Sequence, residues 1–208
     1  MIDTKQKILD SAERLFGEQG YGATSLRQVI AEAGVNLAAI HYHFGSKEEL
    51  VDAVILRKAE PVNRERLEML GRLEAEAGDR PVAMEQILEA FLAPAVSRVA
   101  ANPEFSKLMG RLLGEGMMPA VVDKHFRHVG MRFVKAMAKT LPELSPVELG
   151  WRIHFMIGAM AHTLCAQPVQ FHTGLEMEDG QAVLQRLVAF LSGGMRAPVE
   201  QISRIEVK

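Results

Sequence analysis

Histidine side chains offer the first chemistry to test in this chain, because imidazoles bind metals and transfer protons. His41 and His43 are two residues apart, so on one helix they would point about 200° apart and could not share an ion. His125 and His128 are three apart, which suits a pair of ligands, but no carboxylate or cysteine stands at a matching spacing. We therefore expect no metal site.

Catalytic chemistry is equally poorly supported. His154 and His162 lie two turns apart on an apolar helix, where satisfied core or pocket histidines are expected. Cys165 is the one cysteine, and no motif beside it supplies a base. The sequence has neither a Gly-x-Ser-x-Gly motif nor a glycine loop that would hold phosphate. We predict a protein that is not an enzyme and has no cofactor.

A different chemistry, hydrogen bonding to DNA, is indicated by the segment 24–50. A short helix over 25–33 is followed by Gly34, which permits a sharp turn, and by a very short helix with the small residues Ala38 and Ala39. A third helix begins after Ser46. Helix-turn-helix proteins use this order of elements to place a recognition helix in the major groove.

The helices that must position this segment have clear sequence signals. Ser25 with Gln28, and Ser46 with Glu49, fit the capping-box pattern in which side chains satisfy the first free amides of a helix. Gly20 ends the helix before them. That first helix has one apolar stripe, made of Ile8, Leu9, Ala12, Leu15 and Phe16.

Charge does not by itself indicate DNA binding. Residues 1–58 contain seven Lys and Arg against eight Asp and Glu, and the whole chain has a net charge of −2 with a pI near 6.4. A protein that binds DNA by electrostatics normally has a basic excess. We therefore expect the basic side chains to gather on one face, assisted by helix N-terminal amides. A small helical subdomain without a nucleic-acid role is the alternative.

The remainder of the chain also has helical patterns. Helices are predicted to begin near Asn102, Ser145 and Asp179, while Pro61 should end or kink one helix and Pro94 should bend another. No alternation of apolar and polar residues is long enough for a sheet, so the fold is predicted to be all-α. A chain of 208 residues suffices for a three-helix domain over 1–50 and a larger helical domain over 51–208.

The helix expected over 151–166 is apolar nearly all round, so it should be buried on every side. It would then be a core helix or one shared between the core and a subunit interface. It contains Arg152, His154 and His162 and is too short to span a bilayer. With no signal peptide at the N-terminus, a cytoplasmic protein without a membrane partner is predicted.

Methionine and phenylalanine are frequent over 103–165, which suggests an apolar pocket, although both residues are also ordinary core fillers. The chain has 12 methionines. The predicted lining residues are Phe105, Met109, Leu113, Met117, Phe126, Phe133 and Phe155. One polar residue among Arg111, Arg152 and His162 is expected to hold a carboxylate or thioester head.

The segment from Ile8 to Val54 resembles the N-terminal domain of TetR-family transcriptional repressors. The resemblance implies a double-stranded DNA operator of palindromic form and a homodimer formed by the last two long helices. It also implies contacts to phosphates from Thr24, Tyr42, His43 and Lys47, with Arg27 near the groove. Base-facing positions would be Asn36, Leu37, Ala39 and His41. The sequence departs from the common pattern at Leu37, where lysine is frequent, and at His41, where tyrosine is frequent.

The segments 36–39 and 151–159 resemble the branch of this family that senses fatty acids or acyl-CoA, the PsrA-like branch. That resemblance implies a repressor released from its operator by a small apolar ligand of fatty acyl type. The helix from Ser46 to about Arg57 would transmit the effect of ligand binding to the DNA-binding helices. The alternative is a helix-turn-helix regulator controlled by a protein partner, with no small-molecule ligand.

Overall fold

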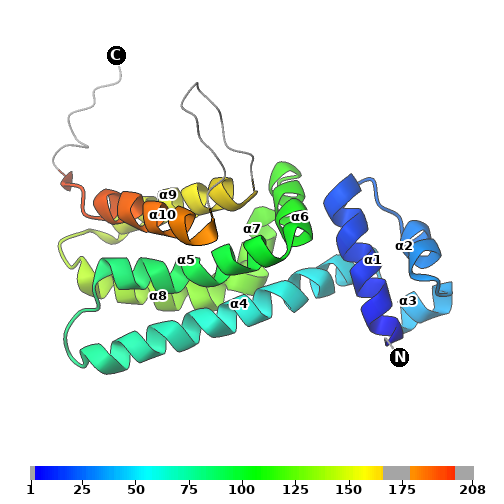
Figure 1. Ribbon diagram of the computed structural model, residues 1–208, viewed down its shortest axis with the longest axis horizontal. Coiled ribbons are helices and arrows are strands. Elements are labelled where there is room, and N and C mark those ends of the chain that lie inside the picture. Colours follow the sequence, from blue (N-terminus) through cyan, green and yellow to red (C-terminus); the bar gives the residue numbers. More distant parts are fainter. Residues whose placement is uncertain (1–2, 166–178, 200–208) are drawn as a thin grey trace, which may run out of the picture. The chain divides into compact units, whose positions relative to one another are not determined.

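The computed structural model describes residues 3–165 and 179–199, and in these residues it contains helices and no strand (Figure 1). The predicted all-α class is confirmed. In chain order the elements are α1 (Thr4–Gln19), α2 (Leu26–Ala33), α3 (Leu37–His43), α4 (Lys47–Ala77), α5 (Met84–Ala101), α6 (Pro103–Gly114), α7 (Met118–Val121), the π-helical η1 (Val122–Phe126), α8 (Arg127–Thr140), α9 (Pro146–Cys165) and α10 (Gly180–Met195).

The predicted helix starts are confirmed by their caps. The Ser25 hydroxyl accepts from the Gln28 amide while the Gln28 side chain accepts from the Ser25 amide. Ser46 and Glu49 repeat this arrangement at the start of α4. The Asn102 side chain accepts from the first free amides of α6. These caps satisfy amides that a helix N-terminus otherwise leaves without partners.

Two prolines do not end their helices. Pro61 lies inside α4 and Pro94 inside α5, and both helices continue beyond them. A proline inside a helix costs about 3 kcal/mol through its missing hydrogen bond and its ring. Ala59 and Val62, on either side of Pro61, are both buried. We attribute the continued helix to this packing, which offsets the local cost.

The described residues form two compact units, and the division differs from the one predicted at residue 50. The first unit contains 3–63 and 99–127, and the second contains 64–98 and the described residues from 128 onward. Helices α6 and α7 and the turn η1 therefore belong with the N-terminal helices. The reason is apolar packing, because Leu108 and Leu112 of α6 are fully buried in the same core as Ile8 and Phe16 of α1.

Helix α1 approaches α6 closely at Gly17. A Cβ atom at this position would lie 3.4 Å from the Glu104 carbonyl oxygen and 3.5 Å from the Leu108 amide nitrogen. Both are backbone atoms, so a larger side chain would push the two helices apart. An alanine Cβ would still fit at van der Waals distance, so the contact requires a small residue at this position.

A buried carboxylate also ties this unit together. Glu13 of α1 is only 5% exposed. It accepts hydrogen bonds from Arg57 and Lys58 of α4 and from the Asn102 side chain at the start of α6. A buried charge is tolerated when it is paired and hydrogen-bonded in this way.

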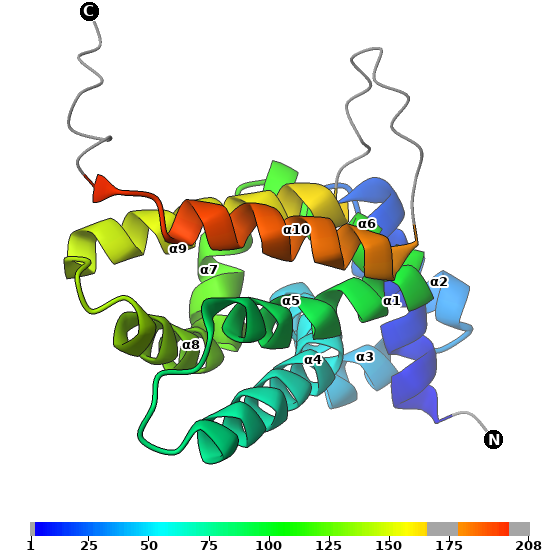
Figure 2. The ribbon, with the colours of Figure 1, turned by 60° about the vertical axis from the view of Figure 1, so that its left-hand side comes forward.

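The second unit has its own core, formed by the latter part of α4 with α5, α8, α9 and α10. Phe91 and Phe133 meet edge to face there, with ring centroids 5.0 Å apart. Helices α9 and α10 lie side by side (Figure 2). Arg152 of α9 joins them, since its guanidinium donates to the Met195 carbonyl oxygen at 2.7 Å and to Glu148 at 2.8 Å.

Helix α9 is not buried on every side within one chain, so it is not enclosed by the core alone, and the alternative of a helix shared with a subunit interface stays a prediction. Trp151 is 56% exposed and Phe155 is 63% exposed, while Phe190 of the neighbouring α10 is 74% exposed. The core of the unit covers only one side of α9, where Leu149 and Met156 are buried. Across 3–165 and 179–199, no helix is long and apolar enough to cross a membrane.

The placement of α6 in the first unit leads to a stability prediction. Truncating the fully buried Leu108 to alanine should lower the free energy of unfolding by about 2–5 kcal/mol, because a cavity opens against α1. The matched change Leu113→Ala on the exposed side of the same helix should cost less than about 1 kcal/mol. Urea unfolding followed by circular dichroism measures both. Equal losses would contradict the assignment of α6 to this core.

Candidate DNA-binding interface

The turn between α2 and α3 is fixed by two residues. Gly34 has φ of 63°, in the left-handed region, and its amide bonds to the Ile30 carbonyl oxygen. Only glycine adopts this conformation without strain. Asn36 then caps α3, because its Oδ1 accepts from the Ala39 amide at 2.9 Å. Val29 and Ile40 are fully buried and anchor the two helices in the core of the first unit.

Helix α3 turns nearly all its side chains away from that core. Ile40 is its one buried residue. Leu37 is half exposed and Tyr42 is 85% exposed, and His41 is also exposed. A seven-residue helix that buries one side chain contributes little to the core. Its exposed surface is therefore free to contact another molecule.

His41 has a defined hydrogen-bonding state. Its Nδ1 lies 3.1 Å from the Gly45 carbonyl oxygen, and a carbonyl only accepts, so Nδ1 carries the proton. In the tautomer with its proton on Nδ1, the Nε2 atom is an acceptor. The amino groups of adenine and cytosine are the donors that the major groove offers to such an acceptor.

Lys47 lies in the first turn of α4, where its Nζ is 4.2 Å from the centre of the Tyr21 ring. The Tyr21 hydroxyl donates to Glu48 at 2.8 Å. Burial, followed by this hydrogen bond, raises the pKa of Tyr21 to about 12, and the same bond lowers the pKa of Glu48. The stacked ring limits where the ammonium can lie. Tyr21 is not among the predicted site residues, and its place between two glycines is the sequence signal that could have indicated it.

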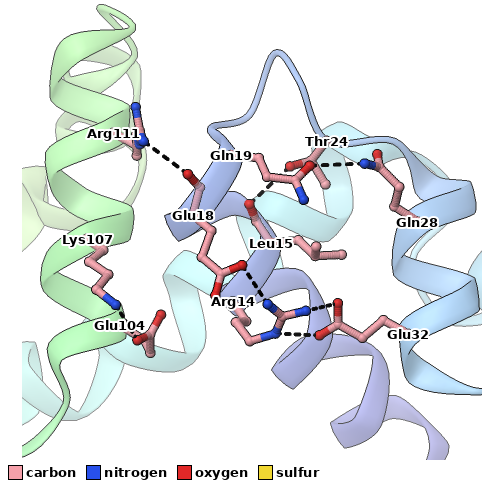
Figure 3. A network of polar contacts seen from close by, with 10 residues as sticks. All are labelled: Arg14, Leu15, Glu18, Gln19, Thr24, Gln28, Glu32, Glu104, Lys107 and Arg111. Carbon is pink, nitrogen blue, oxygen red and sulfur yellow. Dashed lines mark hydrogen bonds and ion pairs between the residues drawn. The ribbon is translucent and has the colours of Figure 1, made fainter.

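A polar network joins α1 to α2 (Figure 3). Arg14 of α1 pairs with Glu32 of α2 and with Glu18 of its own helix. The hydrogen bond to Glu32, followed by that to Glu18, raises the pKa of Arg14. The Gln28 side chain of α2 also donates to Gln19 at 3.0 Å. The helix before the turn is thus held along its length.

Internal pairing explains how a segment without a basic excess can present free positive charge. Within residues 1–58, Arg14, Arg57 and Lys58 pair with carboxylates of the first unit. The other four basic residues have no carboxylate within ion-pair distance in the described part of the chain: Lys5, Lys7, Arg27 and Lys47. Because acidic side chains of the segment are engaged in ion pairs and helix caps, the unpaired basic side chains remain available to bind a polyanion such as DNA.

Thr24 does not take the role predicted for its side chain. It is 2% exposed, and its hydroxyl donates to the carbonyl oxygens of Gly20, at 2.8 Å, and Leu15, at 3.2 Å. The single hydroxyl proton is already used inside the unit, so it cannot also bind a phosphate. Thr24 instead holds the loop between α1 and α2.

The other residues predicted to contact phosphates include Tyr42 and His43, whose rings meet edge to face with centroids 5.0 Å apart. Arg27, predicted to lie near the groove, is exposed on α2. An open depression of about 350 Å³ lies beside the Tyr42 and His43 rings. Its lining residues are Lys5, Tyr42, His43, Phe44, Gly45, Glu49 and Ala53.

The residues predicted to line a ligand pocket are divided between the two units. The first unit holds Phe105, Met109, Arg111, Leu113, Met117 and Phe126, and the second holds Phe133, Arg152, Phe155 and His162. Met109, Met117 and Phe126 pack against the core of the first unit, while Phe133 belongs to the core of the second. Leu113, Phe155 and His162 are exposed. These side chains serve two separate cores and the surface, rather than one cavity in one unit.

Metal chemistry finds no place in the described residues, which contain no group of three His, Cys, Asp or Glu side chains able to hold an ion. His125, one of the histidines considered as ligands, has another partner. Its Nε2 lies 2.7 Å from Oδ1 of Asp52 in α4. That contact holds η1 against α4 in the first unit.

Curated relatives match the N-terminal part of the chain. It is 48% identical to the HTH-type transcriptional regulator LmrA of Bacillus subtilis over 54 residues, which are 25% of this chain and 29% of LmrA. It is 44% identical to AcrR of Shigella flexneri over 52 residues, 25% of this chain and 24% of AcrR. The chain therefore spans less than a third of the length of these relatives.

Solved structures match over nearly the whole chain but at low identity. The fatty acid degradation regulator FadR of Bacillus halodurans has a TM-score of 0.64 at 15% identity, covering 95% of this chain and 99% of FadR. FadR of Bacillus subtilis, solved in complex with stearoyl-CoA, has a TM-score of 0.64 at 14% identity, covering 91% and 98%. Identities this low show a shared fold.

Family models match both parts of the chain. Residues 8–54 match the model of bacterial regulatory proteins of the tetR family. Residues 89–194, about half of the chain, match the tetracyclin repressor-like C-terminal domain. With the capped helix-turn-helix and the exposed α3 described above, these matches show that the chain belongs to the TetR family of bacterial regulators.

Proposed function

We propose that this protein is a DNA-binding transcriptional repressor that places α3 in the major groove of a palindromic operator. The observation that carries the proposal is the exposed surface of α3, which buries only Ile40 and is fixed by Gly34 and Asn36. A short helix that a rigid turn presents to solvent is the geometry of a recognition helix.

The geometry supports separate roles for two groups of residues. Asn36, Leu37, Ala39 and His41 are the base-facing residues, and Leu37 supplies an apolar contact such as one to a thymine methyl group. Tyr42, His43 and Lys47 contact phosphates of the DNA backbone, where contacts position a protein without reading sequence. Arg27 lies near the groove. The Thr24 hydroxyl is not part of this set.

A homodimer is the second element of the proposal. Trp151 and Phe155 of α9 and Phe190 of α10 are large, apolar and exposed in one chain. The Trp151 and Phe155 rings stack with centroids 5.9 Å apart, which makes a continuous apolar surface. Such a surface is typical of an interface between subunits. We therefore assign the dimer contact to α9 and α10, and two copies of α3 would read half-sites about one helical turn apart.

The third element is release of the operator by a small apolar ligand of fatty acyl type. Support comes from the shared fold with regulators whose printed titles name fatty acid degradation and stearoyl-CoA. Within the first unit, η1 and α6 are bonded to the DNA-binding helices. Asp52 of α4 accepts from Lys124 and contacts His125, and Arg111 donates to the Glu18 carbonyl oxygen of α1. A ligand that displaces η1 or α6 would therefore act on α1 and α4.

The DNA contacts can be separated by mutation. Lys47→Ala should weaken binding to all sequences alike and lower the slope of log affinity against log salt by about one, since one phosphate contact is lost. His41→Ala should instead reduce discrimination between bases by about 1–3 kcal/mol. Fluorescence anisotropy with operator variants over a salt series measures both. A changed operator preference in Lys47→Ala with unaltered affinity would contradict these roles.

The assembly is tested on the exposed apolar surface. Phe155→Glu should give monomers that no longer hold the operator, because a charge would be buried in the interface. Met131→Glu replaces a similarly exposed apolar residue on α8, away from the proposed contact, and should leave the dimer intact. Analytical ultracentrifugation at micromolar concentration measures the oligomeric state of each protein. If the wild-type protein is a monomer, the proposal of a homodimer is wrong.

Ligand control is tested by adding fatty acids, acyl-CoAs, aromatic acids and cationic drugs to the protein–operator complex. A ligand that prefers the released state a hundredfold, worth about 2.7 kcal/mol, should lower operator affinity a hundredfold. Release by acyl compounds alone supports the fatty acyl class. Release by planar cations alone contradicts the fatty acyl class but is consistent with a repressor. If no compound releases the operator, control by a protein partner is favoured.

A further inference from the structure

Arg66 of α4 is a buried arginine in the core of the second unit. It is 3% exposed. Its Nε donates to the Phe91 carbonyl oxygen at 2.7 Å, and its guanidinium carbon lies 4.0 Å from the centre of the Phe91 ring. One terminal nitrogen approaches the Met160 sulfur at 3.7 Å. The charged group is thus surrounded by a carbonyl, an aromatic face and a thioether.

Nothing of opposite charge meets this group in the part of the chain that the structure describes. Arg132, Arg152 and Arg196 of the same unit each pair with a carboxylate, from Glu74, Glu148 and Glu85 respectively. For Arg66, burial is the one influence on the guanidinium, and it lowers the pKa to about 10. Arg152 is nearly as buried but has both a carboxylate and the Met195 carbonyl oxygen.

The guanidinium also has hydrogen-bonding capacity left over. It carries five N–H donors, and the described residues accept two of them, one through a weakly accepting thioether. A buried cation without a counter-charge is costly, and the cost falls when an anion is bound. A carboxylate fits best, since its two oxygens match the parallel donors of a guanidinium.

The surroundings indicate what the rest of such a ligand must be. Leu67, Leu70 and Met160 belong to the apolar core of the second unit, as does Phe91 beneath the guanidinium. An anion that reaches Arg66 therefore has to bring an apolar body with it. We propose that Arg66 binds the carboxylate of an organic acid with an elongated apolar body, and that this acid is the ligand that controls the regulator. The proposal rests on the function proposed above and specifies its ligand class.

Arg66 replaces the three anchors expected from the sequence. Arg111 lies in the first unit and donates to the Glu18 carbonyl oxygen. Arg152 already has the Glu148 carboxylate as its counter-charge, although its Nη2 is buried without a partner, and His162 is exposed. Arg66 combines a full charge, burial and free donors.

The test compares one ligand with and without its charge, using the full chain and no DNA. Decanoate and decanol, both below the micelle concentration, are titrated by calorimetry. Wild-type protein should bind decanoate at least about tenfold more tightly than decanol. Arg66→Met, which keeps the apolar bulk, should bind the two equally. The control Arg132→Met removes an exposed arginine of the same unit and should keep the wild-type preference.

A second variant keeps the test decisive if Arg66→Met does not fold. Arg66→Lys retains the charge but loses the paired donors, so decanoate should bind about tenfold more weakly while decanol is unaffected. Equal wild-type binding of decanoate and decanol would overturn the proposal, and so would an unchanged preference in either Arg66 variant. Decanoyl-CoA has no free carboxylate. If the Arg66 variants weakened its binding as much as they weaken decanoate binding, Arg66 would bind the coenzyme phosphates, and the proposed carboxylate site would be wrong.

Operator release is measured separately, so the two proposals fail in different ways. If decanoate binds through Arg66 but does not lower operator affinity, the proposal of ligand control is contradicted and the proposal of an anion site at Arg66 still stands. Release by decanol as strong as release by decanoate would leave ligand control and overturn the role of the charge.

Discussion

The buried carboxylate of Glu13 is the interaction on which the DNA-binding unit depends. It lies on α1 and is bonded to Arg57 and Lys58 of α4 and to Asn102 at the start of α6. Breaking any of these contacts would leave a buried charge without its partners, which is strongly destabilising. The position of α1 is therefore fixed relative to two helices that are far apart in the sequence.

Other contacts of the unit extend from this fixed helix. Gly17 brings the α6 backbone close to α1, and Arg14 holds α2 through Glu32. Thr24 uses its hydroxyl to hold the loop between α1 and α2. The recognition helix follows α2 after a single turn, so its position is set by α1 through α2. The surface proposed to read DNA thus depends on polar contacts that α1 makes with other parts of the unit.

Local chemistry made much of this fold predictable from the sequence. Caps such as Ser25, Ser46 and Asn102 act within a few residues, so their hydrogen bonds follow from spacing alone. The core to which a residue belongs does not follow from spacing alone. The pattern of Leu108 and Leu112 predicts an apolar face on α6, but the partner of that face is decided by packing over long sequence separation. The same limit applies to Thr24, whose burial no local pattern reveals, and to Pro61, where tertiary packing outweighs a local signal. Arg66 was missed because a lone arginine in a helical pattern predicts a solvated side chain.

The small contribution of α3 to the core has an evolutionary consequence. Four of its seven side chains, Leu37, Ala38, His41 and Tyr42, are exposed and could change without leaving a cavity, whereas Ile40 is buried and Ala39 packs against the core. Substitutions there would alter which operator is bound at almost no cost in folding free energy. The scaffold of this regulator is therefore well suited to acquire new target genes, since operator choice and protein stability are encoded by different residues.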